Sequence, residues 1–91
     1  GYLGVIIFEG KNAAEENCVF IKIRRAVNFS GIDLRIAEGK IKELFGNLYM
    51  GGGGHAGAVS FRIHLLDEKE LLAQLENLFR FLNGVIDLNG K

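Results

Sequence analysis

The alternation of apolar and polar residues predicts three β-strands. Residues 2–8 are apolar at both alternation phases, which is typical of an interior strand that is covered on both faces. In residues 18–25 and 58–65 apolar residues alternate with polar ones, so one face of each strand should be buried. The residues expected to face the core are Val19, Ile21, Ile23, Val59, Phe61 and Ile63.

A first helix is predicted over residues 31–45, where apolar residues recur at intervals of three and four. Ser30 and Asp33 form a typical start signal for this helix, and Gly46 suits its C-terminal cap. Gly39 lies in the middle of the pattern and costs about 1 kcal/mol relative to alanine, which weakens the helical pattern there.

A second helix is predicted over residues 67–82, beginning with Asp67. Gly84 marks its expected end, and residues 85–88 are expected to form a last short strand or a stub. One stripe of this helix is expected to be core or an intrachain interface, and it consists of Leu71, Leu75, Leu78, Phe79 and Leu82.

The segments between these elements are rich in turn-forming residues. Residues 9–17 have turn formers at both ends and no apolar stripe, so they are expected to form a solvated connection. Residues 51–57 contain five glycines, which offer no side chains to pack and have much backbone freedom to lose. This segment is therefore expected to be a loop.

Length and composition are those of one globular domain, residues 1–91, in which 48% of the residues are hydrophobic. The expected architecture is α/β, with a small mixed β-sheet packed with two helices and a glycine-rich loop between the first helix and the following strand. The chain opens without methionine and enters a strand almost at once, so we expect it to be a piece of a longer polypeptide. No apolar run is long enough to span a bilayer, and no membrane partner is expected.

The single cysteine, Cys18, forms no intramolecular disulfide and matches no paired zinc spacing. It is expected to be a small core or edge residue. A lone cysteine favours a reducing compartment, and we expect a cytoplasmic protein.

Charge is balanced over the whole chain, with 11 basic and 11 acidic residues, but it is not evenly distributed. Between Lys22 and Lys42 six basic residues stand against Asp33 and Glu38, and the second predicted helix is mainly acidic. Any site for an anion must therefore be local.

The glycine run suggests one such site, because amide groups without neighbouring Cβ atoms can converge on an anion. His55 follows the run and adds a donor, while Lys22 and Arg24 share one face of the second predicted strand. The run lacks the Lys-Ser/Thr pair of a phosphate-binding P-loop and no helix follows it. A flexible connection, or a place where two backbones cross closely, would fit the same glycines.

Residues 51–60, Gly-Gly-Gly-Gly-His-Ala-Gly-Ala-Val-Ser, resemble the Gly-Gly-Gly-His-Pro-x-Ala-Ala-Gly signature of the accessory C-terminal domain of DHH-family phosphoesterases. Residues 21–25, Ile-Lys-Ile-Arg-Arg, are similar to the strand motif of that domain, whose fourth residue is arginine. The family includes RecJ-like exonucleases, nano-RNases and cyclic-dinucleotide phosphodiesterases. Ala56 stands here in place of the proline, and Lys22 stands where serine is frequent.

The resemblance implies that this chain binds the phosphate-bearing part of a substrate. It assigns the glycine-histidine loop to Gly52, Gly53, Gly54 and His55 and the phosphate clamp to Arg24. Lys22 and Ser60, which differ from the family pattern, complete the candidate site.

The resemblance also implies that catalysis belongs to a separate N-terminal domain of the same full-length chain, with Mn²⁺ or Mg²⁺ as its cofactor. No carboxylate cluster, ligand-spaced histidine pair or nucleophile-base pair occurs in this sequence. We therefore expect no catalytic residue and no metal ligand here, and a chain that does not hydrolyse its substrate alone.

The expected partners are a single-stranded nucleic acid or a short oligonucleotide or nucleotide, and the catalytic domain. Two alternatives are a regulatory module that binds a small nucleotide, and a structural or partner-binding domain that binds no phosphate. The sequence leaves open whether the substrate is DNA, RNA, a cyclic dinucleotide or polyphosphate.

Overall fold

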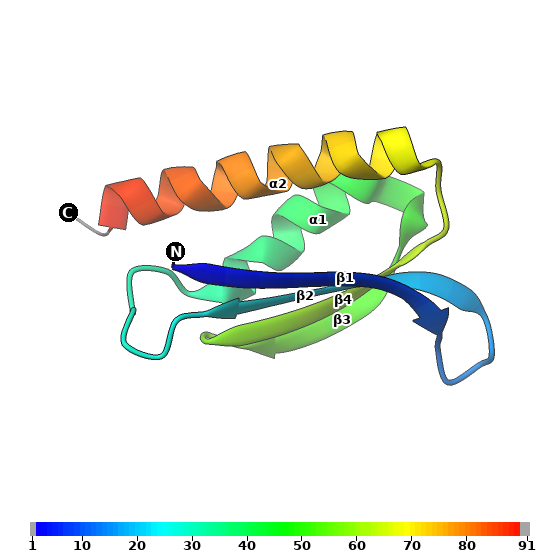
Figure 1. The fold of residues 1–91 in the computed structure, drawn as a ribbon, viewed down its shortest axis with the longest axis horizontal. Helices are drawn as coiled ribbons and strands as arrows, with labels where there is room; N and C mark the ends of the chain where they lie inside the picture. The colour runs from blue at the N-terminus through cyan, green and yellow to red at the C-terminus, as the bar shows by residue number, and fades with distance from the viewer. Residues whose placement is uncertain (1, 90–91) are drawn as a thin grey trace.

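The computed structural model describes residues 2–89, which are arranged in the order ββαββα (Figure 1). The strands are β1 (Leu3–Lys11), β2 (Asn17–Arg25), β3 (Tyr49–His55) and β4 (Ala58–His64). The helices are α1 (Ala37–Phe45) and α2 (Glu68–Asn89), and the 3-10 turns η1 (Leu34–Ile36) and η2 (Gly46–Leu48) flank α1.

The strands form one sheet in the order β1-β2-β4-β3, and every neighbouring pair is antiparallel. Both helices lie on the same side of this sheet, so its other face is uncovered (Figure 1). The α/β architecture with a small sheet and two helices is confirmed. The sheet is antiparallel rather than mixed because β1 connects to β2, and β3 to β4, through turns too short for a parallel crossover.

The core lies between the covered face of the sheet and the two helices. All six strand residues predicted to face inward are at most 5% exposed. The helices supply the opposite side of the core with Ala37, Ile41, Phe45, Leu75, Leu78, Leu82 and Ile86. Cys18 is also fully buried, as expected.

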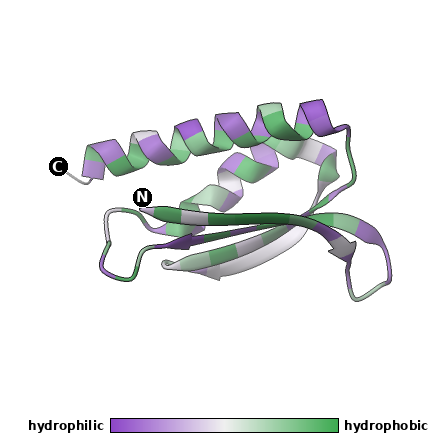
Figure 2. Cartoon of the chain, viewed as in Figure 1, coloured by the Kyte–Doolittle hydropathy of each residue, from purple (hydrophilic) through white to green (hydrophobic). Residues whose placement is uncertain are grey.

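β1 is an edge strand, and the prediction of an interior strand covered on both faces is wrong. The first part of β1, up to Phe8, is apolar (Figure 2), yet Ile6 is 62% exposed and Phe8 is 41% exposed. The sheet ends at β1, and the helices cover only one of its faces. An apolar run at both alternation phases shows that a strand lacks polar side chains. It does not show whether the strand has a neighbour on each side or a covering layer on each face.

The glycine-rich segment is strand β3 rather than the predicted loop. Gly52 pairs with Phe61 and Gly53 with Ser60 of β4, and only Ala56 and Gly57 form the turn between the two strands. A sheet is held by backbone hydrogen bonds, which glycine makes as well as any other residue. β4 offers that backbone partner, and the low intrinsic strand preference of glycine is therefore overridden.

The first helix starts later than residue 31. Ile32 is 2% exposed, and its carbonyl accepts a hydrogen bond of 2.7 Å from Nη1 of Arg25, which holds this stretch outside the helix. Asp33 caps η1 by accepting from the amide of Arg35 at 3.0 Å. The helix ends at Gly46 as predicted, with a φ of 52°.

The second helix begins as predicted, with Oδ2 of Asp67 accepting from the amide of Lys69 at 3.1 Å. It continues through Gly84 to Asn89, so the helix end expected at Gly84 and the short strand or stub expected at residues 85–88 are both wrong. The apolar stripe explains the extension, because Ile86 continues the spacing of Leu78 and Leu82 and is 5% exposed. That burial outweighs the cost of one helical glycine, about 1 kcal/mol.

Candidate functional site

The antiparallel register aligns the predicted site residues in rows across the sheet. Lys22 of β2 pairs with Ser60 of β4, and Ser60 pairs with Gly53 of β3. Because directly paired residues point to the same face, these three positions share one row. The even-numbered positions of β2 alternate with the buried Ile21 and Ile23, so this row lies on the uncovered face.

A second row on this face contains Arg24 and His55. Arg24 pairs with Ala58 of β4, and Ala58 pairs with His55 of β3. These two candidate residues are therefore two strand spacings apart, about 10 Å. We call the uncovered side of the sheet the open face. The rows through Arg24, Lys22 and Phe20 contribute these paired positions to it: Gly4, Ile6, Phe8, Phe20, Lys22, Arg24, Gly51, Gly53, His55, Ala58, Ser60 and Arg62.

A hollow of about 530 Å³ lies on the open face and gathers most of the predicted site. Its lining includes five of the seven predicted residues: Lys22, Arg24, Gly53, Gly54 and Ser60. The remaining lining residues are Gly4, Val5, Ile6, Ile23, Ala58 and Val59. We call this feature the basic hollow.

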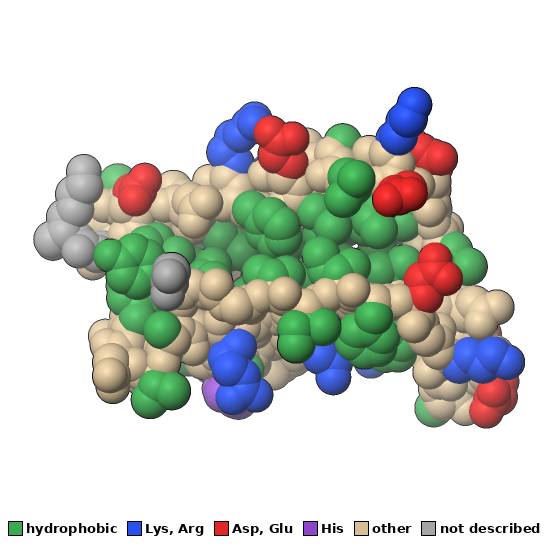
Figure 3. Space-filling model, in the orientation of Figure 1, with side chains coloured by type: hydrophobic (Ala, Val, Ile, Leu, Met, Phe, Trp, Pro, Cys, Tyr) green, Lys and Arg blue, Asp and Glu red, His purple; other side chains and the backbone are tan. Residues whose placement is uncertain are grey.

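The open face is positively charged and carries no carboxylate at its paired positions. Lys22, Arg24 and Arg62 form no ion pair with the described residues. Figure 3 shows Lys and Arg side chains along the lower surface of the molecule, on the side away from the helices. Cations that no carboxylate neutralises are available to an anionic ligand.

Arg25, next to Arg24, has a different role. Its guanidinium donates to the carbonyl of Ile32, so it fastens the chain after β2 to the sheet. Arg24 points to the open face and is exposed. Of these two neighbouring arginines, Arg24 is the one available for binding.

The glycine amides do not form the converging nest that a loop would allow. Successive amides of a strand point to opposite sides, and β3 stays paired with β4 from Gly51 to His55, after an irregularity in register between Tyr49 and Gly51. Gly52 lies on the covered face, opposite the buried Phe61, and does not line the basic hollow. The prediction of a loop whose amides converge on one anion is therefore wrong, because the amides of β3 alternate in direction instead of meeting at one point.

The glycines of β3 serve two different purposes. A Cβ at Gly52 would collide with the carbonyl of Ser60 and come within 2.8 Å of the Cα of Phe61. A Cβ at Gly54 would collide with the carbonyl of Ala58, and the φ of Gly54 is 154°. A Cβ at Gly53 meets nothing within 4 Å. Packing therefore requires glycine at positions 52 and 54, whereas at position 53 glycine keeps the basic hollow open.

Gly4 was missed by the sequence analysis. It lies opposite Arg24 in β1 and lines the basic hollow, where an added Cβ would meet only the Arg24 carbonyl, at 3.9 Å. A glycine inside a strand can mark close approach of a ligand, and this signal was present at Gly4.

His55 lies on the open face but at the end of the sheet. Its side chain is exposed, and its Nδ1 accepts a hydrogen bond of 3.1 Å from the amide of Gly57. His55 does not line the basic hollow and could contact only a ligand that extends past Arg24 toward the turn.

A second arginine near β3 is already neutralised. Arg35 lines a smaller hollow of about 190 Å³ with Gly53 and Gly54, but its Nη2 lies 2.6 Å from Oδ2 of Asp33. The hydrogen bonds from Arg35, and then its charge, hold the pKa of Asp33 at about 2. Arg35 is therefore paired with an ionised Asp33 across the neutral pH range.

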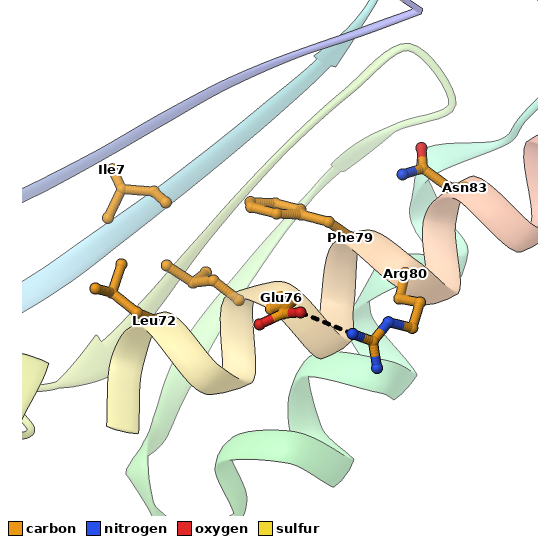
Figure 4. Close-up of a pocket in the computed structure, with 7 residues that line it drawn as sticks. Ile7, Leu72, Glu76, Phe79, Arg80 and Asn83 are labelled. Carbon is orange, nitrogen blue, oxygen red and sulfur yellow. Dashed lines mark hydrogen bonds and ion pairs between the residues drawn. The ribbon is translucent and has the colours of Figure 1, made fainter. Parts of the chain in front are cut away.

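An apolar hollow on the other side of β1 has a different character. It lies between β1 and α2 and is lined by Ile7, Leu72, Leu75, Phe79 and Asn83, together with Glu76 and Arg80 (Figure 4). Arg80 donates to Glu76 at 2.7 Å, so its charge is balanced. The one cation that lines this apolar hollow, Arg80, is therefore already paired with a carboxylate.

Within residues 2–89, no group of three or more His, Cys, Asp or Glu side chains is placed to hold a metal ion. Neither helix in this part of the chain is long and apolar enough to cross a membrane. No protein-family model, no curated protein and no solved structure matches the chain significantly.

Proposed function

We propose that this chain binds the phosphate groups of a nucleic acid or short nucleotide on its open face. In this proposal it is the substrate-binding domain of a metal-dependent phosphodiester hydrolase of the DHH family. Hydrolysis itself would belong to an N-terminal catalytic domain of the same full-length chain. We place this activity in the cytoplasm, a reducing compartment compatible with the lone thiol of Cys18.

One observation carries the proposal. Lys22, Arg24 and Ser60 line a single hollow, although Ser60 is far from the other two in the sequence. Guanidinium and ammonium groups neutralise phosphate, and a hydroxyl donates to its oxygens. The bare backbone at Gly4 and Gly53 lets a phosphate approach these three side chains.

The proposed role is positioning. Arg24 and Lys22 neutralise a phosphate that does not react, and thereby fix the distance between it and the phosphodiester bond to be cleaved. The described residues hold no metal cluster, so Mn²⁺ or Mg²⁺ would bind in the catalytic domain and supply the attacking hydroxide there. We assign no step of the cleavage to this chain.

A titration of the ¹⁵N-labelled chain followed by NMR tests the proposal. Sulfate, a mononucleotide and a short single strand are added separately. We expect the amide signals of Lys22, Arg24, Gly53 and Ser60 to shift with each ligand, while those of α2 stay in place. If no ligand moves these signals at low salt, the chain has no phosphate site and the proposal is wrong.

The same titration distinguishes the two alternative functions. A small-molecule regulatory module would bind the mononucleotide saturably, and longer strands would not compete with it. A structural or partner-binding domain would show no saturable shift with any of the three. Competition between strand and mononucleotide for the same amides is the outcome that supports our proposal.

A further inference from the structure

Two phenylalanine side chains stack on the open face, outside the core. Phe8 of β1 pairs with Phe20 of β2, and their rings are 4.9 Å apart between centroids with 11° between the ring planes. Phe8 is 41% exposed. The core on the other face of the sheet accounts for neither ring.

Cations flank this aromatic pair. Nζ of Lys22 lies 5.7 Å from the centre of the Phe8 ring, and Arg62 pairs with Phe20 across β2 and β4. Phe20 and Arg62 also line a hollow of about 450 Å³ together with Lys11 and Asn12. Each ring of the aromatic pair therefore has a cation beside it, Lys22 near Phe8 and Arg62 opposite Phe20, whereas Lys11 forms an ion pair with Glu15.

Aromatic rings beside cations on an open four-stranded sheet are suited to nucleobases. Bases stack on aromatic side chains, and basic groups around them follow the phosphate backbone. Inorganic phosphate and polyphosphate have no flat apolar surface and gain nothing from Phe8 and Phe20. The acid-free character of this face also disfavours a cationic ligand.

The separation along β2 sets the size of the ligand. Phe20 and Arg24 are four residues apart, so their positions are about 13 Å apart along the strand. A phosphate at Arg24 and a base at Phe20 would therefore belong to neighbouring nucleotides of one strand. A duplex keeps its bases stacked inside and cannot offer one to this surface.

We propose that Phe8 and Phe20 form a stacking platform for a nucleobase of a single-stranded oligonucleotide whose phosphate occupies the basic hollow. This inference rests on the proposed function, because it takes the basic hollow as the phosphate site. It adds that the ligand carries bases and is longer than one nucleotide.

The test compares a labelled thymidine tetranucleotide with two competitors, an abasic strand of equal length and tripolyphosphate. Fluorescence anisotropy at fixed ionic strength measures the three affinities. We expect the base-bearing strand to bind about tenfold more tightly than the abasic strand, in line with measured base-aromatic stacking. The variants Phe8→Leu and Phe20→Leu should each reduce the affinity ratio between the base-bearing and the abasic strand to about one.

Two further variants separate stacking from folding. Phe20→Trp keeps a flat aromatic surface and should retain the preference for bases. Phe79→Leu removes an aromatic ring from the groove between β1 and α2, away from the open face, and should leave both affinities unchanged. Circular dichroism melts confirm that each variant is folded at the temperature of the assay.

Failure of the platform differs from failure of the phosphate site. If the abasic and base-bearing strands bind equally and Arg24→Ala weakens both, the platform is wrong and the phosphate site stands. If neither strand binds the wild-type chain at low salt, both proposals are wrong.

Discussion

Arg24 and His55 pair with the same residue, Ala58, from opposite sides of β4. They are 31 residues apart in the sequence, yet the antiparallel register places them in one row on one face. Arg24 lines the basic hollow and His55 does not. The two residues therefore contribute differently: Arg24 to the centre of the candidate site and His55 to its margin.

Arg24→Ala should weaken oligonucleotide binding about tenfold, because it removes from the basic hollow a guanidinium that forms no ion pair within residues 2–89. One lost phosphate contact should also make the plot of log affinity against log salt shallower by about 0.7 for a single strand. Anisotropy titrations at several salt concentrations measure both effects. The control is Arg80→Ala, which removes a guanidinium paired with Glu76 on α2; equal losses for both variants would mean that only net charge matters.

Gly53→Val should fill part of the basic hollow while the fold stays intact, because a Cβ at Gly53 meets nothing within 4 Å. We expect stability within about 0.5 kcal/mol of wild type and clearly weaker phosphate binding. Gly52→Ala should lose about 1–3 kcal/mol, because its Cβ has no room against Ser60 and Phe61. Urea unfolding and the binding titration give the two values; a Gly53→Val chain that binds normally would show that the hollow is not used.

Tyr49→Phe should change stability at alkaline pH. The hydroxyl of Tyr49 donates to Glu38 at 2.7 Å, and burial, followed by this bond and the charge of Glu38, raises the pKa of Tyr49 to about 12. A group whose pKa is higher in the folded chain than in the unfolded chain makes its full contribution to the stability of the fold at pH values below its unfolded pKa, which is 10.0 for Tyr49. That contribution is lost as the pH rises to about 12.

We therefore expect Tyr49→Phe to lower the free energy of unfolding by about 1 kcal/mol at neutral pH. Above about pH 10 the free energy of unfolding of the variant should depend less on pH than that of the wild type. Urea unfolding at pH 7 to 11 measures this difference. Tyrosinate absorbance in a Tyr2→Phe background reports Tyr49 alone. Ionisation of Tyr49 with the ordinary pKa of tyrosine in the folded chain would contradict the effect assigned to its burial and to its bond with Glu38.

Gly84→Ala should stabilise the chain by about 0.5–1 kcal/mol, because position 84 is inside a helix. A Cβ there meets nothing within 4 Å, so packing does not oppose the gain. Gly46→Ala is the matched control: it also meets nothing within 4 Å, but its φ of 52° is unfavourable for alanine. Thermal unfolding should show a higher melting temperature for the first variant and a lower one for the second; two gains would contradict the positive φ of Gly46.

The strands β2 and β4 and the apolar stripe of α2 could be predicted because local pattern and burial agree there. Val19, Ile21 and Ile23 alternate with polar residues, and the core takes this face. Ile32 lies outside such a pattern, and its burial delays the first helix. Gly84 suggested a helix end, but the burial of Ile86 carried α2 past it.

Five of the seven predicted site residues line the basic hollow, but the shape of the hollow could not be predicted. Lys22 and Arg24 could be placed on one face from the period of β2, whereas Ser60 and Gly53 join them only through pairing with β4 and β3. The glycine run predicts a loop because the types of side chain in a segment do not show whether its backbone pairs with another strand. The same reason hid the stacking of Phe8 on Phe20, which depends on the register of β1 against β2.

The amino-acid sequence by itself determined which side chains are available and which face of each regular element is apolar, because these follow from residue type and from the period of a strand or helix. Tertiary structure alone decided that β1 is an edge, that the glycines form a strand, and that Lys22, Arg24 and Arg62 share the face of the sheet that neither helix covers. Those features arise from backbone hydrogen bonds between distant segments, and such bonds do not depend on side-chain identity.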